Sequence, residues 1–400
     1  MRKHLILPGA ALGIALTLAV IQPNAPAAVE SSQRDRLFAA FDRIRANYVD
    51  ALDESELVTT AINGMTGVLD SESVYIDAKD FRNMQVNHPF VGLGLQIKMI
   101  RDKGSVRVVA PIDDSPAAKA GVKVNDVITP IDGVPLQGLT VYQVVDKILG
   151  PVNTSVRLTV MRAGNDKPVE LTAVRQIITM RSVRVRQDGE DIGYIRIATL
   201  NDTTMPNLAT AIAELRNQLL PDKIKGYVLD LRNSATGVLD VAVLVADVFL
   251  EDGEIVSVHG RDPERIERFN ARPGDSINGK PLIVLINGGT AAGAEIVAGA
   301  LQDHRRATVI GDRSFGKGSV QTIVPLGSRN GALRLTTGRY FTPAGRSIDA
   351  VGIRPDIEVV QDFPQRPEND KALAMAFDLL RGARHTYRQK EHCNRRGGAL

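Results

Sequence analysis

Residues 282–301 read LIVLINGGTAAGAEIVAGAL, and this stretch decides the fold. The apolar run Leu282–Ile286 has the length and composition of a buried strand, and glycines then interrupt the pattern. Small and apolar residues suited to a helix follow from Ala291 to Leu301. A buried strand that leads directly into a helix predicts a sheet covered by helices.

The same alternation extends over most of the second half of the chain. Further strands are expected at Gly193–Ile197 and Tyr227–Leu231, with helices at Met205–Leu219 and Leu239–Leu250. Proline and glycine then break a final β-rich segment, and residues 363–367 indicate a linker to a last helix at 370–380. The tail beyond Arg384 is basic. This half therefore predicts an α/β layer with a C-terminal helix.

Two different patterns precede this layer. Residues 31–81 show apolar side chains at helical spacing, a stripe that suits either a core or an interaction face. Residues 86–174 show short alternating strands separated by glycines. Short helices are expected there at Pro116–Ala120 and Val141–Ile148, with Thr140 as the N-cap of the second.

The N-terminus has the layout of a signal peptide. Arg2 and Lys3 precede an apolar run, Leu5–Ile21, and the small residues Ala25–Ala28 suit a cleavage site. We therefore expect an exported, periplasmic protein without a stable membrane span after cleavage. The alternative is an uncleaved anchor helix, because the apolar run is nearly long enough to span a bilayer.

Composition excludes several classes of function. Lys and Arg total 49 against 46 Asp and Glu, a net charge of +3 that makes nucleic acid a poor first candidate. The single cysteine, Cys393, cannot form a disulfide within the chain. The histidines lack paired metal-ligand spacing, so we expect no metal and no cofactor.

The β-rich region resembles a PDZ domain. The resemblance rests on residues 90–95 (FVGLGL), 114–122 (DSPAAKAGV) and 125–133 (NDVITPIDG). It implies that the loop of Val91, Gly92, Leu93 and Gly94 binds a peptide carboxylate through backbone N–H groups. The following strand would then pair with the bound peptide.

The remaining motifs resemble those of the C-terminal processing peptidases, a family of tail-specific serine–lysine proteases. They are listed in chain order: 193–197 (GYIRI), 230–233 (DLRN), 285–289 (LINGG), 295–303 (EIVAGALQD), 311–321 (GDRSFGKGSVQ) and 342–348 (TPAGRSI). The resemblance covers nearly the whole mature chain.

The resemblance implies a multidomain α+β fold in which a PDZ module precedes a crotonase-like ββα peptidase core. The expected segments are a signal peptide at 1–28, a helical segment at 29–83, the PDZ domain at 84–175, the peptidase core at 176–362, and a linker, helix and basic tail at 363–400.

The resemblance also implies the catalytic residues. Lys317 matches the lysine base, which must be buried to lose its proton, and Gln321 matches the residue that orients it. On a strand these two side chains would share one face. Gly237 and Gly293 match the oxyanion-hole positions, and Ala292 occupies the place of the nucleophilic serine.

Asp303 matches an acid that some members place near the serine–lysine pair. The alternative is a helix-terminal aspartate that pairs with Arg305 or Arg306. Thr290 lies two residues before Ala292, and Ser314 and Ser319 flank Lys317 in sequence. Thr290 is expected to cap the helix, and neither Ser314 nor Ser319 is favoured as a substitute nucleophile.

Two other motifs depart from the family pattern. Ser234–Gly237 replaces a glycine-rich turn, and the β-branched Thr236 would resist a positive φ. Leu69–Tyr75 also differs from the usual motif. These scattered changes favour natural decay of the site over a single introduced substitution.

Three functions remain open. The chain is a homologue that binds protein or peptide C-termini but lacks a nucleophile, or an active endopeptidase in which Ala292 was introduced. As a third alternative it is a structural or regulatory subunit that forms a homo-oligomer or pairs with an active paralogue.

Overall fold

The computed structural model describes residues 31–84, 91–100, 104–178, 181–220, 222–327, 330–359 and 369–382. The predicted signal peptide, the linker at 363–367 and the tail beyond Arg384 lie outside these ranges. The chain divides into two compact units, Met1–Ile62 and Asn63–Leu400. In the described parts, no helix is long and apolar enough to cross a membrane.

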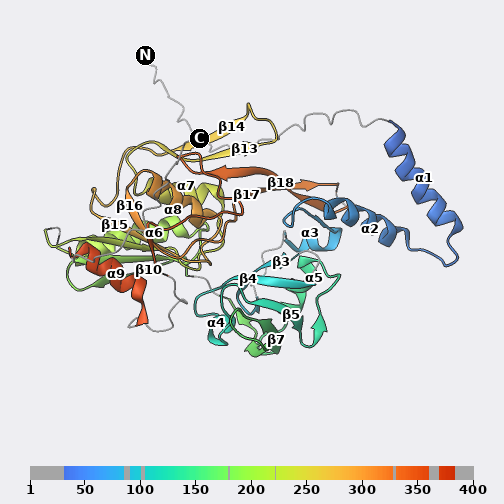
Figure 1. The fold of residues 1–400 in the computed structure, drawn as a ribbon, viewed down its shortest axis with the longest axis horizontal. Helices are drawn as coiled ribbons and strands as arrows, with labels where there is room; N and C mark the ends of the chain where they lie inside the picture. Colours follow the sequence, from blue (N-terminus) through green and yellow to red (C-terminus); the bar gives the residue numbers. More distant parts are fainter. Residues whose placement is uncertain are drawn as a thin grey trace, which may run out of the picture. The chain divides into compact units, whose positions relative to one another are not determined.

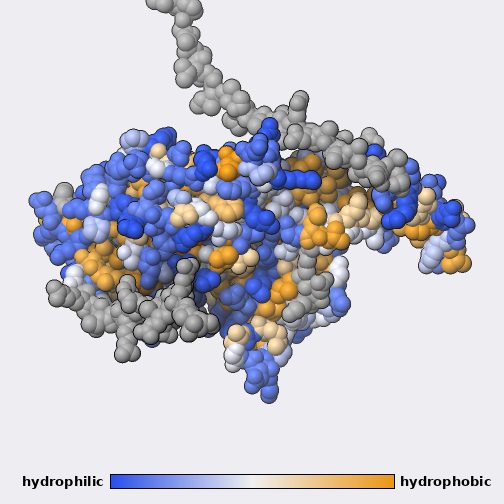
Figure 2. Space-filling view, turned by 45° about the horizontal axis from the view of Figure 1, so that its top comes forward, coloured by the Kyte–Doolittle hydropathy of each residue, from blue (hydrophilic) through white to orange (hydrophobic). Residues whose placement is uncertain are grey.

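The first unit contains α1 (Ser31–Asn47) and most of α2 (Glu54–Gly67). Asp53 caps α2, because its carboxylate accepts the backbone N–H of Ser55 at 2.8 Å. The apolar stripe predicted for this region lies at the surface, as the orange side chains of Figure 2 show. Leu37, Phe38, Ile44 and Tyr48 of this stripe are all exposed.

The centre of the second unit is a six-stranded sheet in the order β10-β11-β12-β15-β16-β19. β10 is antiparallel to β11, and the remaining pairs are parallel. The strands are β10 (Val183–Asp188), β11 (Ile192–Ile197), β12 (Gly226–Asp230), β15 (Leu282–Ile286), β16 (Ala307–Gly311) and β19 (Ile357–Glu358).

Helices cover both faces of this sheet (Figure 1). Side chains alternate along each strand, so Val284 and Ile286 join one core while Ile283 and Leu285 join another. The first core is closed by α6 (Thr204–Gln218), α7 (Leu239–Asp247) and α8 (Gly293–Asp303), and the second by α9 (Lys371–Leu380). Burial on both faces explains why β15 is a continuous apolar run.

An antiparallel sheet joins distant segments of the same unit. Its order is β1-β18-β13-β14, and β17 also pairs with β18. The strands are β1 (Val74–Ile76), β13 (Glu254–Gly260), β14 (Ile266–Asn270), β17 (Ser319–Pro325) and β18 (Ala332–Phe341). The sequence pattern did not predict the β13–β14 hairpin or the strand at β1.

The β-rich module is a five-strand ladder, β3-β4-β5-β7-β8, to which β6 adds at β5. A separate pair joins β2 to β9. Its elements are β2 (Val91–Gly92), β3 (Leu95–Ile100), β4 (Ser105–Pro111), α4 (Pro116–Lys119), β5 (Val127–Ile131), β6 (Val134–Pro135), α5 (Val141–Ile148), β7 (Ser155–Met161), β8 (Val169–Val174) and β9 (Gln176–Ile177).

Thr140 caps α5 in a full capping box with Gln143, as predicted. The second unit also contains α3 (Ala78–Met84). The predicted fold class, a β-rich module before an α/β core with a C-terminal helix, is confirmed.

Candidate active site

Ala292 lies at the junction where the loop after β15 enters α8. Its backbone angles are φ 52° and ψ −122°, which are unusual for a residue with a Cβ. Residues held in such regions cost about 1–3 kcal/mol and persist only where the surroundings impose them. The fold therefore maintains a strained turn at the position that the family resemblance assigns to the nucleophile.

The buried carboxylate of Glu295 connects this turn to the lysine loop. One oxygen, Oε2, accepts the backbone N–H of Ala292 at 3.0 Å and that of Lys317 at 2.8 Å. The other, Oε1, accepts the Ser314 hydroxyl at 2.5 Å and the Gly316 N–H at 2.7 Å. Through these four bonds Glu295 sets the distance between the helix start and the lysine loop.

Burial raises the pKa of Glu295 to about 7, although these hydrogen bonds act in the opposite direction. Glu295 had no predicted role. A glutamate three residues after a helix N-cap is the signal that could have found it. Only half of a capping box forms, because Ala292 has no side-chain oxygen.

Lys317 lies in the loop between β16 and β17. Burial lowers the pKa of its ammonium below the usual range, which favours the neutral amine that a general base requires. The carboxylate of Glu72 opposes this shift, and the nearby cations Arg334 and Lys98 reinforce it. Glu72, in the altered Leu69–Tyr75 motif, is, like Glu295, a charged residue near Lys317 that had no predicted role.

Gln321 lies on β17, which begins at Ser319, so Lys317 precedes the strand. The alternation of a strand therefore does not place these two side chains on one face. The Gln321 amide nitrogen donates to Ser319 at 3.1 Å and to Thr336 at 2.8 Å. Its amide oxygen is buried and has no partner among the described residues. Its role in orienting Lys317 stays a prediction.

The two predicted oxyanion glycines lie side by side. A Cβ built on Gly237 would be 3.5 Å from the Cα of Gly293 and 2.7 Å from the Cβ of Leu200. Thr236 keeps a negative φ, and the positive φ of this turn is taken by Asn233 at 55°. The structure therefore brings the two glycines together, and Thr236 avoids the positive φ that a β-branched residue resists.

Asp303 lies at the opposite end of α8 from Ala292. Eleven residues at 1.5 Å each separate the two ends by about 16 Å. Its carboxylate accepts the Ala344 N–H at 2.9 Å and pairs with Arg346. The structure does not bring Asp303 to the lysine loop, and the expected pairing with Arg305 or Arg306 is wrong.

The neighbouring hydroxyls have structural partners. The Thr290 hydroxyl is buried, donates to the Leu231 carbonyl at 2.9 Å and accepts the Asn287 N–H at 3.0 Å. It ties the loop to the end of β12, so its predicted N-cap role is wrong. The Ser314 hydroxyl donates to Glu295 and accepts the Ile353 N–H at 2.6 Å, and that of Ser319 accepts from Gln321.

The β-rich module packs directly against this site. Val109 and Ala110 of β4 form an apolar cluster with Ala235 and Ala291. Ala235 lies two residues before Gly237, and Ala291 directly precedes Ala292. Beside it, Arg196 of β11 makes a two-pronged ion pair with Asp113, with both N–O distances at 2.9 Å. The module therefore touches the candidate site through apolar and charged contacts.

Arg196 belongs to a buried charge network that reaches α9. Burial would raise the pKa of Asp230, but Arg232 and Arg196 outweigh it and hold that pKa at about 2. Arg232 also bonds Asp370 at 2.8 Å. Asp370 in turn caps α9 through the Leu373 N–H at 3.0 Å.

The glycine loop before β3 has the geometry that needs glycine. Gly94 has φ 72°, and a Cβ there would lie 2.4 Å from that of Ser115. The carbonyls of Leu93 and Gly94 accept N–H groups from Ala117 and Ile112, both at 2.9 Å. These bonds fix the loop against α4. The predicted contact of residues 91–94 with a carboxylate stays a prediction.

Comparison with known proteins identifies the family. Residues 191–359 match the model of peptidase family S41, and residues 107–162 match a PDZ domain. A carboxy-terminal-processing protease of Bartonella bacilliformis is 50% identical over 328 residues, which cover 82% of this chain and 75% of the relative. A carboxyl-terminal-processing protease of Synechocystis is 35% identical over 351 residues, which cover 85% of this chain and 81% of the relative.

A solved structure shares the architecture as well. The photosystem II D1 C-terminal processing protease aligns with a TM-score of 0.69 at 28% identity, over 83% of this chain and 94% of that one. Sequence and fold thus agree over most of the chain. The protein belongs to the carboxy-terminal processing proteases of peptidase family S41 and carries their PDZ domain.

Proposed function

We propose that this protein binds protein C-termini through its PDZ domain and does not hydrolyse them. The observation that carries the proposal is Ala292 at the strained start of α8, joined through Glu295 to the loop of a buried Lys317. A methyl group has no lone pair with which to attack a carbonyl carbon. The site keeps its base and its turn but has no nucleophile in the family's position.

The nearby hydroxyls support this proposal. Both Thr290 and Ser314 are buried and serve as donor and acceptor within the loop network. A nucleophile must instead be free to reach the substrate carbonyl. Removal of the nucleophile from a comparable serine protease lowers kcat by about 10⁶-fold.

The test compares the chain with its Ala292→Ser variant on a peptide that ends in a free apolar residue. We expect binding but no cleavage by the original chain. Lys317-dependent cleavage by the original chain would overturn the proposal, and Lys317→Ala in each background is the matched control. Efficient cleavage by the Ala292→Ser variant alone supports an intact site in which a single change removed activity.

A second candidate function is that of a subunit that assembles with an active paralogue or with itself. The observation in its favour is the exposed apolar side chains on α1 and directly after it, where Phe38 of α1 is 58% exposed and Tyr48, which follows the helix, is 56% exposed. Light scattering of the mature chain, alone and mixed with an active paralogue, tests it. Replacing Phe38 and Tyr48 by serine should abolish any complex that forms.

We further propose that the chain is exported to the periplasm after cleavage of residues 1–28. The basic start, the apolar run Leu5–Ile21 and the small residues that follow support this location. Cell fractionation with N-terminal sequencing of the mature protein tests it. Recovery of an intact N-terminus from the membrane fraction would favour the uncleaved anchor instead.

A further inference from the structure

The first strand of the PDZ ladder has an unpaired edge. In the described part of the ladder, β3 is bonded to β4 on one side and to no strand on the other. Such an edge presents N–H and C=O groups to which an extended peptide can add as another strand. A terminus seated at Gly92–Gly94 would place the upstream residues along β3, toward Ile100.

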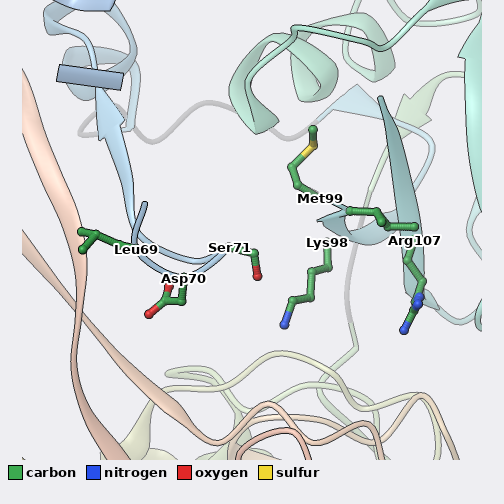
Figure 3. Close-up of a pocket in the computed structure, with 7 residues that line it drawn as sticks. Leu69, Asp70, Ser71, Lys98, Met99 and Arg107 are labelled. Atoms are coloured by element: carbon green, nitrogen blue, oxygen red, sulfur yellow. The ribbon is translucent and has the colours of Figure 1, made fainter. Parts of the chain in front are cut away.

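The two faces of β3 offer different surfaces to such a peptide. Leu95, Ile97 and Met99 pack on the apolar cluster that includes Val144 of α5. Lys98 points the opposite way from Met99, as strand alternation requires (Figure 3). Peptide residues opposite Leu95 or Ile97 therefore face the apolar side, and the residue opposite Lys98 faces the other side.

That other side carries an unusual pair of cations. Lys98 lies directly opposite Arg107 of β4 in the strand register. Both side chains extend toward the same side in Figure 3 and line a cavity of about 340 Å³. Like charges placed opposite each other on one face destabilise a sheet.

The described residues compensate this pair only in part. Glu72 lies 3.4 Å from the Lys98 ammonium, whereas Arg107 has no ion-pair partner among the described residues. Asp70 is the one acid that lines the cavity, and its carboxylate accepts the N–H groups of Glu72 and Ser73 at 2.9 and 2.8 Å. An anion between Lys98 and Arg107 would relieve their repulsion.

We propose that the Lys98–Arg107 pair selects C-termini that carry Asp or Glu three residues before the last residue. The inference rests on the proposed capture of C-termini by the PDZ domain. With the last residue opposite Leu95, the third residue upstream lies opposite Lys98. Its side chain points to the face with the two cations, so a carboxylate there completes the charge pairing.

The experiment measures binding of the mature chain to ten-residue fluorescent peptides that end in an apolar residue. Glu stands three residues before the end in one peptide and four residues before the end in a second, and the third has Gln at both positions. We expect the first peptide to bind about three- to tenfold more tightly than the other two, with the advantage shrinking as salt rises. The double variant Lys98→Gln/Arg107→Gln should lose this advantage but still bind the Gln peptide.

Controls distinguish a failure of the charge preference from a failure of the proposed C-terminal binding. Lys119→Gln, at an exposed lysine on α4 of the same domain, should keep the preference. Equal affinity for all three peptides, or equal gain from Glu at both positions, would overturn the inference and leave C-terminal capture standing. If no peptide binds, or if C-terminal amidation changes nothing, the proposed capture itself is wrong. Retained binding of the Gln peptide shows that the double variant is folded.

Discussion

Replacement of Glu295 by glutamine should remove a specific part of the protein's pH dependence of stability. The folded-state pKa of this carboxyl is about 7, against an ordinary value of 4.5. Between pH 4.5 and pH 7 the folded state therefore holds a proton on this carboxyl that the unfolded state has released. Stability from this group is fully present below pH 4.5 and is lost as pH rises through 7.

The size of the effect follows from the shift. About 2.5 units at 1.36 kcal/mol each amounts to about 3 kcal/mol, most of which falls between pH 5 and pH 8. Glutamine cannot ionise, so Glu295→Gln removes this slope. Its amide nitrogen would also face two of the four donors, and it cannot accept a hydrogen bond, whereas a carboxyl oxygen can accept one in either protonation state; each lost bond costs about 1–3 kcal/mol.

Urea unfolding at pH 5, 6, 7 and 8 measures both effects. The original chain should lose about 2–3 kcal/mol more than the variant between pH 5 and pH 8, because other titrating groups contribute equally to both. The variant should be the less stable of the two at pH 5. Parallel pH profiles, or a variant that loses more stability than the original chain as pH rises, would refute the reasoning.

Three further substitutions and one control test contacts at and near the site by chemical denaturation. Ala292→Gly should raise the free energy of unfolding by about 1 kcal/mol, because glycine adopts the positive φ without strain; a loss would show that the turn is not strained. Gly237→Ala should cost about 1–3 kcal/mol, since its Cβ would meet Leu200 at 2.7 Å. Gly64→Ala is the contrasting control, because a Cβ on Gly64 of α2 would meet nothing within 4 Å beyond the adjacent backbone of its own helix; this change should stabilise by about 1 kcal/mol. Arg196→Met should cost about 3 kcal/mol by leaving Asp113 and buried Asp230 without this partner, and a change under about 1 kcal/mol would contradict that role.

Local pattern was sufficient to predict much of the fold. β15 and α5 have the predicted bounds because an apolar run and a capping Thr140 are signals contained within a few residues. The β13–β14 hairpin was missed, since a mostly exposed strand such as Ile266–Asn270 carries little apolar alternation. Pairing of β1 with β18 joins residues more than 250 positions apart, and no local pattern encodes it.

The candidate site was likewise predictable from the sequence only in part. Ala292, Lys317 and the glycine pair were named from motifs, and the fold places the glycines together. The spacing of Glu295 from the helix start is a local signal, but its bonds to the lysine loop join residues about 20 positions apart, and Glu72 reaches Lys317 only through the fold. Asp303 was drawn from a motif as well, yet the length of α8 carries it away from Ala292.

The network that joins Asp113, Arg196, Asp230, Arg232 and Asp370 has a consequence for the order of folding. Asp370 and the helix α9 that it caps follow all strands of the central sheet in the sequence, so they are synthesised after those strands. One apolar face of that sheet, with Val228 and Ile283, stays uncovered until α9 arrives. A nascent chain that stops before Asp370 would therefore hold an exposed apolar surface and an incomplete ion cluster, a form that chaperones or proteases could recognise.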